Sequence, residues 1–129
     1  MEQPQTILIP SYSVILKEKS EDFFENELGQ AIDDILTGLG VGSKQAIYRH
    51  LKNHYGIDQD EIHNQIEDFT KAIEQIFGSV AKLIEIKIIE RLHVKFDDFS
   101  YSPKKEELDF VKYVYGLHEY LQLKLENPV

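Results

Sequence analysis

The chain has 129 residues, no cysteine and a formal net charge of −9. A chain of this length makes about one domain, and without cysteine it forms neither disulfides nor thiolate zinc sites. Its negative charge disfavours unspecific binding to nucleic acid or to anionic membranes, and the sequence shows neither a signal peptide nor an apolar run of membrane-spanning length. We therefore expect one cytoplasmic domain, residues 1–129, with no membrane partner.

Within the N-terminal arm, residues 1–19, residues 6–17 alternate weakly between apolar and polar side chains and are interrupted by Pro10 and Ser11. This pattern predicts a short extended N-terminal arm or hairpin. Ser20 then opens a helix, with Glu21 and Asp22 in its first turn, where carboxylates favour the helix dipole. The apolar face expected for this helix comprises Phe24, Leu28, Ala31, Ile32, Ile35 and Leu39.

The stretch TGLGVGSK, residues 37–44, has the composition of a phosphate-binding loop. Its spacing does not fit G-x-x-x-x-G-K-[ST], because Ser43 separates Gly42 from Lys44 and Thr37 stands where the first glycine belongs. The dinucleotide pattern G-x-G-x-x-G fails as well. We interpret the stretch as a link between two helices, with Ser43 capping the second, and expect neither nucleotide nor other cofactor.

A second helix is predicted for residues 44–55, ended by Gly56. Residues 57–64 form a connector, in which Asp58 and Glu61 have the spacing of a one-turn capping box. Asn64 repeats this cap with Glu67 at the start of a third helix, which Gly78 ends. Its expected buried residues are Ile66, Phe69, Ile73 and Phe77.

Residues 79–96 alternate in part like a strand, but apolar residues recur every four positions, which favours a helix. Because it is apolar on more than one side, we expect this helix at the centre of the domain. Its apolar series is Val80, Ile84, Ile88, Leu92 and Phe96.

After the loop 97–102, Pro103 stands at the first position of a last helix that runs to about Lys124. Its buried stripe is expected to be Leu108, Val111, Val114, Leu117 and Leu121. The whole chain is thus predicted to be an all-α, compact bundle of about five helices. Its parts are the N-terminal arm 1–19, a helical core 20–96, and the loop and C-terminal helix 97–129.

Four pieces of the sequence occur in an order typical of a known small family: "LG" at 39–40, "KQAIY.HL" at 44–51, "F..AIE.IFG" at 69–78 and "AKL.E" at 81–85. Over residues 23–96 the chain resembles the Nitrosopumilus output domain five family, a small archaeal module found alone or attached to signal-transduction proteins. The resemblance implies a helical regulatory domain and supplies no catalytic residues. The chain departs from the family pattern at Ile62-His63, where a proline often stands, and at the junction after Gly78.

Two histidines, His50 and His54, lie four residues apart on the second predicted helix, a spacing that metal sites use. They are weak candidates, because zinc needs a third or fourth ligand, for which His63 and Asp58 are the nearest choices. The acidic run 58–69 fails as a calcium-binding loop, since Ile62, His63 and Phe69 occupy positions that need ligands or glycine. We interpret the many carboxylates as solvated helix faces and expect no enzyme.

Residues 44–56 form a basic island without any acidic residue. We predict an interaction surface for a protein partner of acidic character, made of Lys44, Tyr48, Arg49, Lys52 and His54. The alternative is a DNA-binding transcriptional regulator that uses helix 44–55, as in a helix-turn-helix. Against it stand a turn that looks longer than three or four residues and only three firm positive charges.

The apolar N-terminal residues 7–9 and 12–16, together with Tyr113, Tyr115 and Tyr120, offer more apolar surface than one central helix needs. Such surplus surface marks an interface, so we predict a two-fold homodimer. The alternative is that both segments cover their own core. The function predicted from all these features is a non-enzymatic archaeal regulatory or signal-transduction output module that acts through protein–protein contacts.

Overall fold

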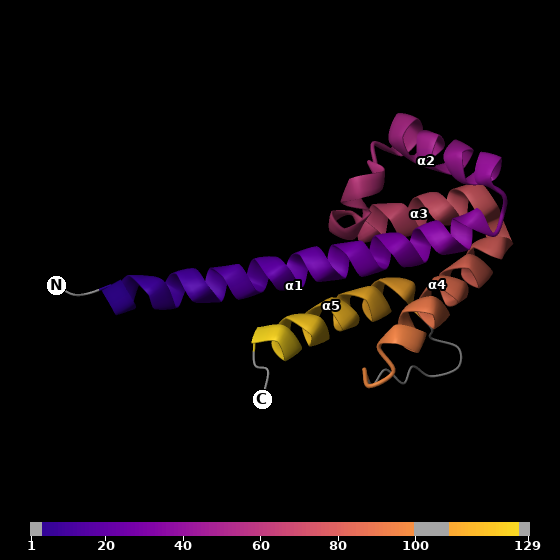
Figure 1. The fold of residues 1–129 in the computed structure, drawn as a ribbon. Helices are drawn as coiled ribbons and strands as arrows, with labels where there is room; N and C mark the ends of the chain where they lie inside the picture. Colours follow the sequence, from indigo (N-terminus) through magenta and orange to yellow (C-terminus); the bar gives the residue numbers. More distant parts are fainter. Residues whose placement is uncertain (1–3, 100–108, 127–129) are drawn as a thin grey trace.

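The structure is a computed structural model and describes residues 4–99 and 109–126, leaving out the side chains of residues 4–18 and 126. Within this part of the chain all regular structure is helical, which confirms the predicted all-α bundle of about five helices (Figure 1). The α-helices are α1 (Pro4–Thr37), α2 (Val41–Tyr55), α3 (Ile66–Phe77), α4 (Ala81–Lys95) and α5 (Phe110–Glu126). Two 3₁₀ helices, η1 (Gln59–Asn64) and η2 (Gly78–Val80), flank α3.

The predicted N-terminal arm or hairpin is wrong, because α1 is one unbroken helix of 34 residues. Ser20 does not open a helix; it lies well inside α1, and its side chain is buried. Pro4 stands at the start of the helix, where a proline removes no backbone bond, and Pro10 removes one of many. The N-terminal part of α1 therefore runs on far beyond the end of α5 (Figure 1).

The C-terminal half of α1 forms the centre of the bundle and contacts α2, α4, α5 and η1. Four residues of its predicted apolar face are buried: Phe24, Leu28, Ala31 and Ile32. Ile35 is only half-buried, and Leu39 is exposed because the helix ends at Thr37. Leu36, which was not expected in the core, is fully buried instead.

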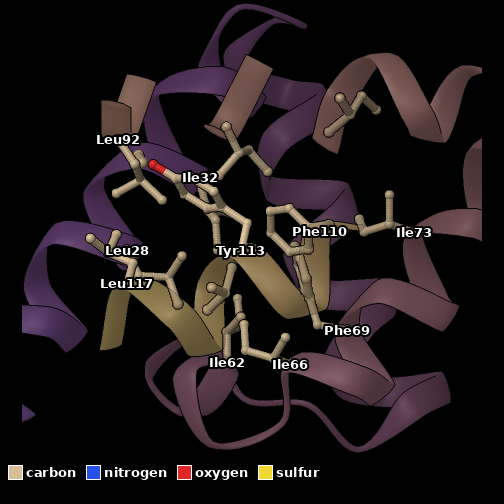
Figure 2. Close-up of a cluster of buried hydrophobic side chains, with 14 of the residues drawn as sticks. Leu28, Ile32, Ile62, Ile66, Phe69, Ile73, Leu92, Phe110, Tyr113 and Leu117 are labelled. Carbon is tan, nitrogen blue, oxygen red and sulfur yellow. The ribbon is translucent and has the colours of Figure 1, made fainter. Parts of the chain in front are cut away.

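The main core brings α1, α3, α4 and α5 together around Tyr113, which lies in the middle of the cluster in Figure 2. Phe69 of α3 and Phe110 of α5 face one another there, with ring centroids 6.4 Å apart. Ile84, Ile88, Leu92 and Phe96 are buried as predicted, whereas Phe77 is only half-buried and Val80 is exposed.

The central position predicted for residues 79–96 is also wrong. Leu83 and Val94 of α4 are 52% and 82% exposed, so this helix lies at the surface of the bundle. The central place is taken by α1. Periodicity alone did not separate the two, because both helices carry apolar residues on more than one side.

The glycine stops are confirmed, since Gly56 and Gly78 adopt φ values of 67° and 58° at the ends of α2 and α3. The predicted side-chain caps are wrong. Ser43 lies inside α2, and neither Asp58 nor Gln65, the residues before η1 and α3, makes a side-chain cap hydrogen bond. Asn64 instead donates a hydrogen bond to Glu61.

The last helix begins at Phe110, so its predicted start at Pro103 is wrong; Pro103 itself and Leu108 lie outside the described residues. Asp109 caps α5, because its side-chain oxygen Oδ1 accepts a hydrogen bond from the backbone N–H of Lys112 at 3.1 Å. Val114, Leu117 and Leu121 form its buried stripe, as expected. None of the described helices is both long and apolar enough to cross a membrane.

Candidate interaction surface

The helix α2 lies on the outside of the bundle and packs on its neighbours through Ile47 and Leu51, which are buried. Residues three or four positions apart share one face of a helix, so the opposite face of α2 is exposed along its length. This face comprises Gln45, Ala46, Arg49, Lys52 and Asn53. His54 is exposed at its edge. Arg49, Lys52 and His54 of the predicted interaction surface are therefore open to a partner.

The other two residues of the predicted surface, Lys44 and Tyr48, are turned toward α1. The Lys44 ammonium lies 3.2 Å from Oδ2 of Asp33, and the Tyr48 hydroxyl donates a hydrogen bond to Oδ1 at 3.1 Å. Burial, followed by the charge of Asp33 and the bond to it, raises the pKa of the Tyr48 phenol above its ordinary value. Both side chains thus anchor α2 on α1.

The predicted histidine pair is close in space but forms no metal site in the described residues. The rings of His50 and His54 have centroids 4.1 Å apart, and His50 also meets the ring of Tyr55 edge-on. His63, a candidate third ligand, is held by Glu25 of α1, with Nδ1 3.7 Å from the carboxylate. No group of three or more histidine and carboxylate side chains able to hold a metal occurs in the described part.

The link between α1 and α2 has only three residues, Gly38–Gly40, and is therefore shorter than the sequence suggested. Gly40 takes a φ of 109°, which favours glycine, and its carbonyl accepts a hydrogen bond from the backbone N–H of Lys44. Gly42 and Ser43 belong to the first turn of α2. The lysine of the glycine-rich stretch faces the carboxylate of Asp33, an arrangement unlike that of a phosphate-binding loop.

A polar groove of about 380 Å³ lies between α1, α2 and η1. Two pairs of its lining residues contact each other: Tyr48 with Asp33, and His63 with Glu25. Its other lining residues are Asn26, Leu28, Gly29, Gln30, Gln59, Asp60 and Ile62. The groove borders the anchored side of α2, and its polar contacts contribute to the attachment of α2 and η1 to α1.

The tyrosines that the sequence assigned to an interface lie in different environments. Tyr113 is buried in the core, and burial raises the pKa of its phenol to about 12. Tyr120 is half-buried and donates a hydrogen bond to Asp98. Tyr115, 48% exposed, is the member of this set that offers a large open surface. The C-terminal helix is therefore mainly a part of the bundle.

Ion pairs along α1 hold α4 and α5 in place. Arg91 and Lys95 of α4 contact Asp34 and Glu27 of α1 at 3.0 and 2.8 Å. On the α5 side, Glu21 accepts a hydrogen bond from Gln122 at 2.9 Å and also contacts His118. Since most of these partners are partly exposed, the pairs contribute little stability and serve mainly to fix the register between helices.

One buried carboxyl group, Glu85 of α4, was missed in the sequence. It is only 4% exposed, and its Oε2 atom has no hydrogen-bond partner within the described residues. Burial, with smaller effects of Glu74 and Asp109, raises the pKa of this carboxyl group, while Lys82 acts in the opposite direction. A helical wheel would have found it, because position 85 lies four residues after Ala81 and three before Ile88, both of which are buried.

Comparison of the chain with protein-family models, curated proteins and solved structures found no match. The resemblance of residues 23–96 to the Nitrosopumilus output domain five family therefore remains a prediction from the four sequence pieces.

Proposed function

We propose that the chain is a non-enzymatic, cytoplasmic regulatory module that acts through protein–protein contacts and pairs with a second copy of itself along α1. The sequence resemblance supports an archaeal signal-transduction output role. The observation that carries the proposal is the continuation of α1 beyond the body of the bundle (Figure 1). A helix of this kind provides a binding element that its own bundle does not cover.

The exposed side of α1 has a regular pattern. In the body of the bundle, Lys19, Phe23, Asn26 and Gln30 are exposed, and they follow one another at intervals of four, three and four residues. The same spacing extended toward the N-terminus reaches sequence positions 16, 12 and 9, which are Leu16, Tyr12 and Ile9. We call positions 9, 12, 16, 19 and 23 the outer stripe. By helical spacing the outer stripe is offset from the buried residues Phe24 and Leu28, and Phe23, its last member, also meets the ring of Phe96 of its own bundle edge-on at 5.8 Å.

A second copy is the partner that fits the outer stripe best. A free helix of about 12 to 15 residues is marginal in water, so the projecting part of α1 gains stability by packing on another apolar surface. Identical stripes on two copies are self-complementary about a two-fold axis. The neighbouring charges Lys17, Glu18, Lys19, Glu21 and Asp22 have both signs, so two helices can approach without strong repulsion.

The exposed face of α2 is the proposed contact for a further, acidic protein. Arg49 and Lys52 share this face, and no acidic residue occurs between positions 44 and 56 to compete with an incoming carboxylate. The anchor of Lys44 and Tyr48 on Asp33 keeps the face oriented outward. Complementary charge of this kind mainly raises the rate and specificity of association.

A DNA-binding regulator is the second candidate, and one observation favours it. The three-residue link between α1 and α2 has the length found in helix-turn-helix proteins. A shift of duplex DNA at low ionic strength, weakening as salt rises and lost in Arg49→Ala with Lys52→Ala, would support this role. Absence of any shift at low salt would contradict it and leave the protein–protein role.

Deletion of residues 1–18 tests the proposed pairing. Light scattering at micromolar concentration should give a dimer mass for the full chain and a monomer mass for residues 19–129. The truncated chain keeps the described core, so its circular dichroism should still be that of a folded helical protein. A full chain with a mass near 15.0 kDa, the mass of one copy, would contradict the proposal.

A further inference from the structure

A second groove, separate from α2 and from the outer stripe, lies between α3, α4 and the start of α5. Its volume is about 670 Å³, within the range of about 300 to 1,000 Å³ that is typical of small-molecule sites. It is lined by Glu67, Thr70, Lys71, Glu74, Lys82, Glu85, Asp109, Phe110, Val111, Lys112 and Tyr115. We call it the Glu85 groove.

Among the described residues that line the Glu85 groove, carboxyl groups outnumber lysines by one. Three lysines, Lys71, Lys82 and Lys112, are matched in number by three carboxylates that are not fully buried: Glu67, Glu74 and Asp109. Glu85 is the additional negative group, and it is the buried one, 4% exposed. Taking an ionised carboxylate out of water is unfavourable unless a cation or hydrogen-bond donors compensate it.

The polar contacts of Glu85 are incomplete, because its Oε2 atom has no hydrogen-bond partner in the described residues. A buried acceptor without a donor is unfavourable, so a ligand that donates a hydrogen bond to Glu85 is favoured. The groove also presents the ring of Tyr115, which is 48% exposed. An aromatic face attracts a cation.

We propose that the Glu85 groove binds a small organic amine whose ammonium group pairs with the carboxylate of Glu85 beside the ring of Tyr115. The described residues hold no cluster suited to a metal ion, which is the other common partner of a carboxylate. An ammonium group supplies the missing donors together with the opposite charge. This site does not depend on self-association through α1.

The pairing should depend on pH in a defined direction. Burial raises the pKa of Glu85, and the protonated acid has no charge to attract an ammonium ion. Affinity should therefore fall as the pH falls through this raised pKa. Among the described residues, the other charged groups that line the groove are Glu67, Lys71 and Glu74 of α3, Lys82 of α4, and Asp109 and Lys112 at the start of α5.

Nuclear magnetic resonance titration of the full chain with n-butylamine at pH 7.5 tests the site. We expect saturable shifts of the backbone signals of Thr70, Glu85 and Tyr115. Glu85→Gln keeps the shape of the side chain and should weaken binding about tenfold or more, the loss expected for a charge-assisted hydrogen bond. Glu90→Gln, on the exposed side of α4 and outside the groove, is the matched control and should bind like the unaltered chain.

A second variant and an uncharged ligand complete the test. Tyr115→Leu alters a half-exposed position that the fold does not require, and it should weaken binding about twofold to fivefold by removing the ring. n-Butanol, which has the same chain without the charge, should cause no saturable shift. Absence of saturable shifts with n-butylamine, equal affinity of the folded Glu85→Gln variant, or equal binding of n-butanol would each overturn the proposal.

Discussion

The two sides of α1 differ in how far the bundle buries them. On the inner side, Phe24, Leu28, Ile32 and Leu36 are buried against the other helices and define what we call the core stripe. On the other side, Phe23 is 37% exposed although it directly precedes Phe24, and it belongs to the outer stripe. The core stripe is buried in the body of the bundle, and the spacing of the outer stripe, extended along the sequence, reaches Leu16, Tyr12 and Ile9. Four of the five positions of the outer stripe are apolar or aromatic, which is the feature on which the proposed pairing of two copies rests.

The largest expected effect is a difference in the free energy of unfolding between variants of two adjacent phenylalanines, one in each stripe. Phe24→Ala removes a ring that is 2% exposed and stacks on His118, and it should lower the free energy of unfolding by about 3 to 5 kcal/mol. Phe23→Ala should lower it by less, about 1 to 2 kcal/mol, because that ring is 37% exposed and makes one edge-on contact, with Phe96. Urea denaturation of both variants at one protein concentration measures the difference, and equal losses would mean that the two stripes are not distinct.

A second pair of adjacent residues compares the contacts that α1 makes with α2 and with α4. Asp33→Ala leaves both Lys44 and Tyr48 without their shared partner, so we expect a loss of about 1 to 2 kcal/mol. Asp34→Ala removes a contact with Arg91, whose side chain is half-exposed, and should cost about 0.5 kcal/mol or less. Thermal denaturation of the two variants measures both losses of stability. A smaller loss for Asp33→Ala than for Asp34→Ala would show that the contacts of Lys44 and Tyr48 with Asp33 do not stabilise the fold.

The smallest expected effect concerns Glu85, the polar member of the buried side of α4, and it depends on pH. Its pKa in the folded protein is above the ordinary value of 4.5, so the folded state binds this proton more tightly than the unfolded state. The proton on Glu85 stabilises the folded protein fully at a pH below the ordinary pKa of 4.5. This stabilisation is lost as the pH rises through the pKa of Glu85 in the folded protein. Glu85→Gln should therefore stabilise the protein by about 1 kcal/mol at pH 8 and hardly at all at pH 4.

Glu90→Gln, at an exposed position of the same helix, is the control for this pH dependence and should leave stability unchanged at both values. Differential scanning calorimetry across the pH range measures both variants. A Glu85→Gln variant that is less stable at pH 8 than the unaltered protein would show that the ionised carboxylate has partners that offset its burial.

The sequence was sufficient where a local rule determines the structure. Gly56 and Gly78 end helices because their positive φ is open to glycine, and apolar residues at helical spacing identified most of the core. It was insufficient where the outcome depends on packing. The alternation within residues 6–17 and the presence of Pro10 favoured an arm, although one lost backbone bond does not end a long helix.

The candidate site could be predicted only in part for the same reason. Composition identified the basic helix, but the contacts of Lys44 and Tyr48 with Asp33 depend on how α2 crosses α1, which no local pattern specifies. The turn before α2 appeared too long because Gly42 and Ser43 seemed to belong to it, whereas they form the first helical turn. Glu85 was overlooked because charged residues on helices are usually solvated.

The most direct test of the central claim, pairing of two copies through the outer stripe, compares two isoleucines of the projecting segment. Position 9 belongs to the outer stripe, and position 7 lies on nearly the opposite side of the helix by its 3.6-residue period. Light scattering at micromolar concentration should give a dimer mass for the unaltered chain and for Ile7→Glu, and a monomer mass near 15.0 kDa for Ile9→Glu. A monomer mass for the unaltered chain, or the same mass for both variants, would contradict the account.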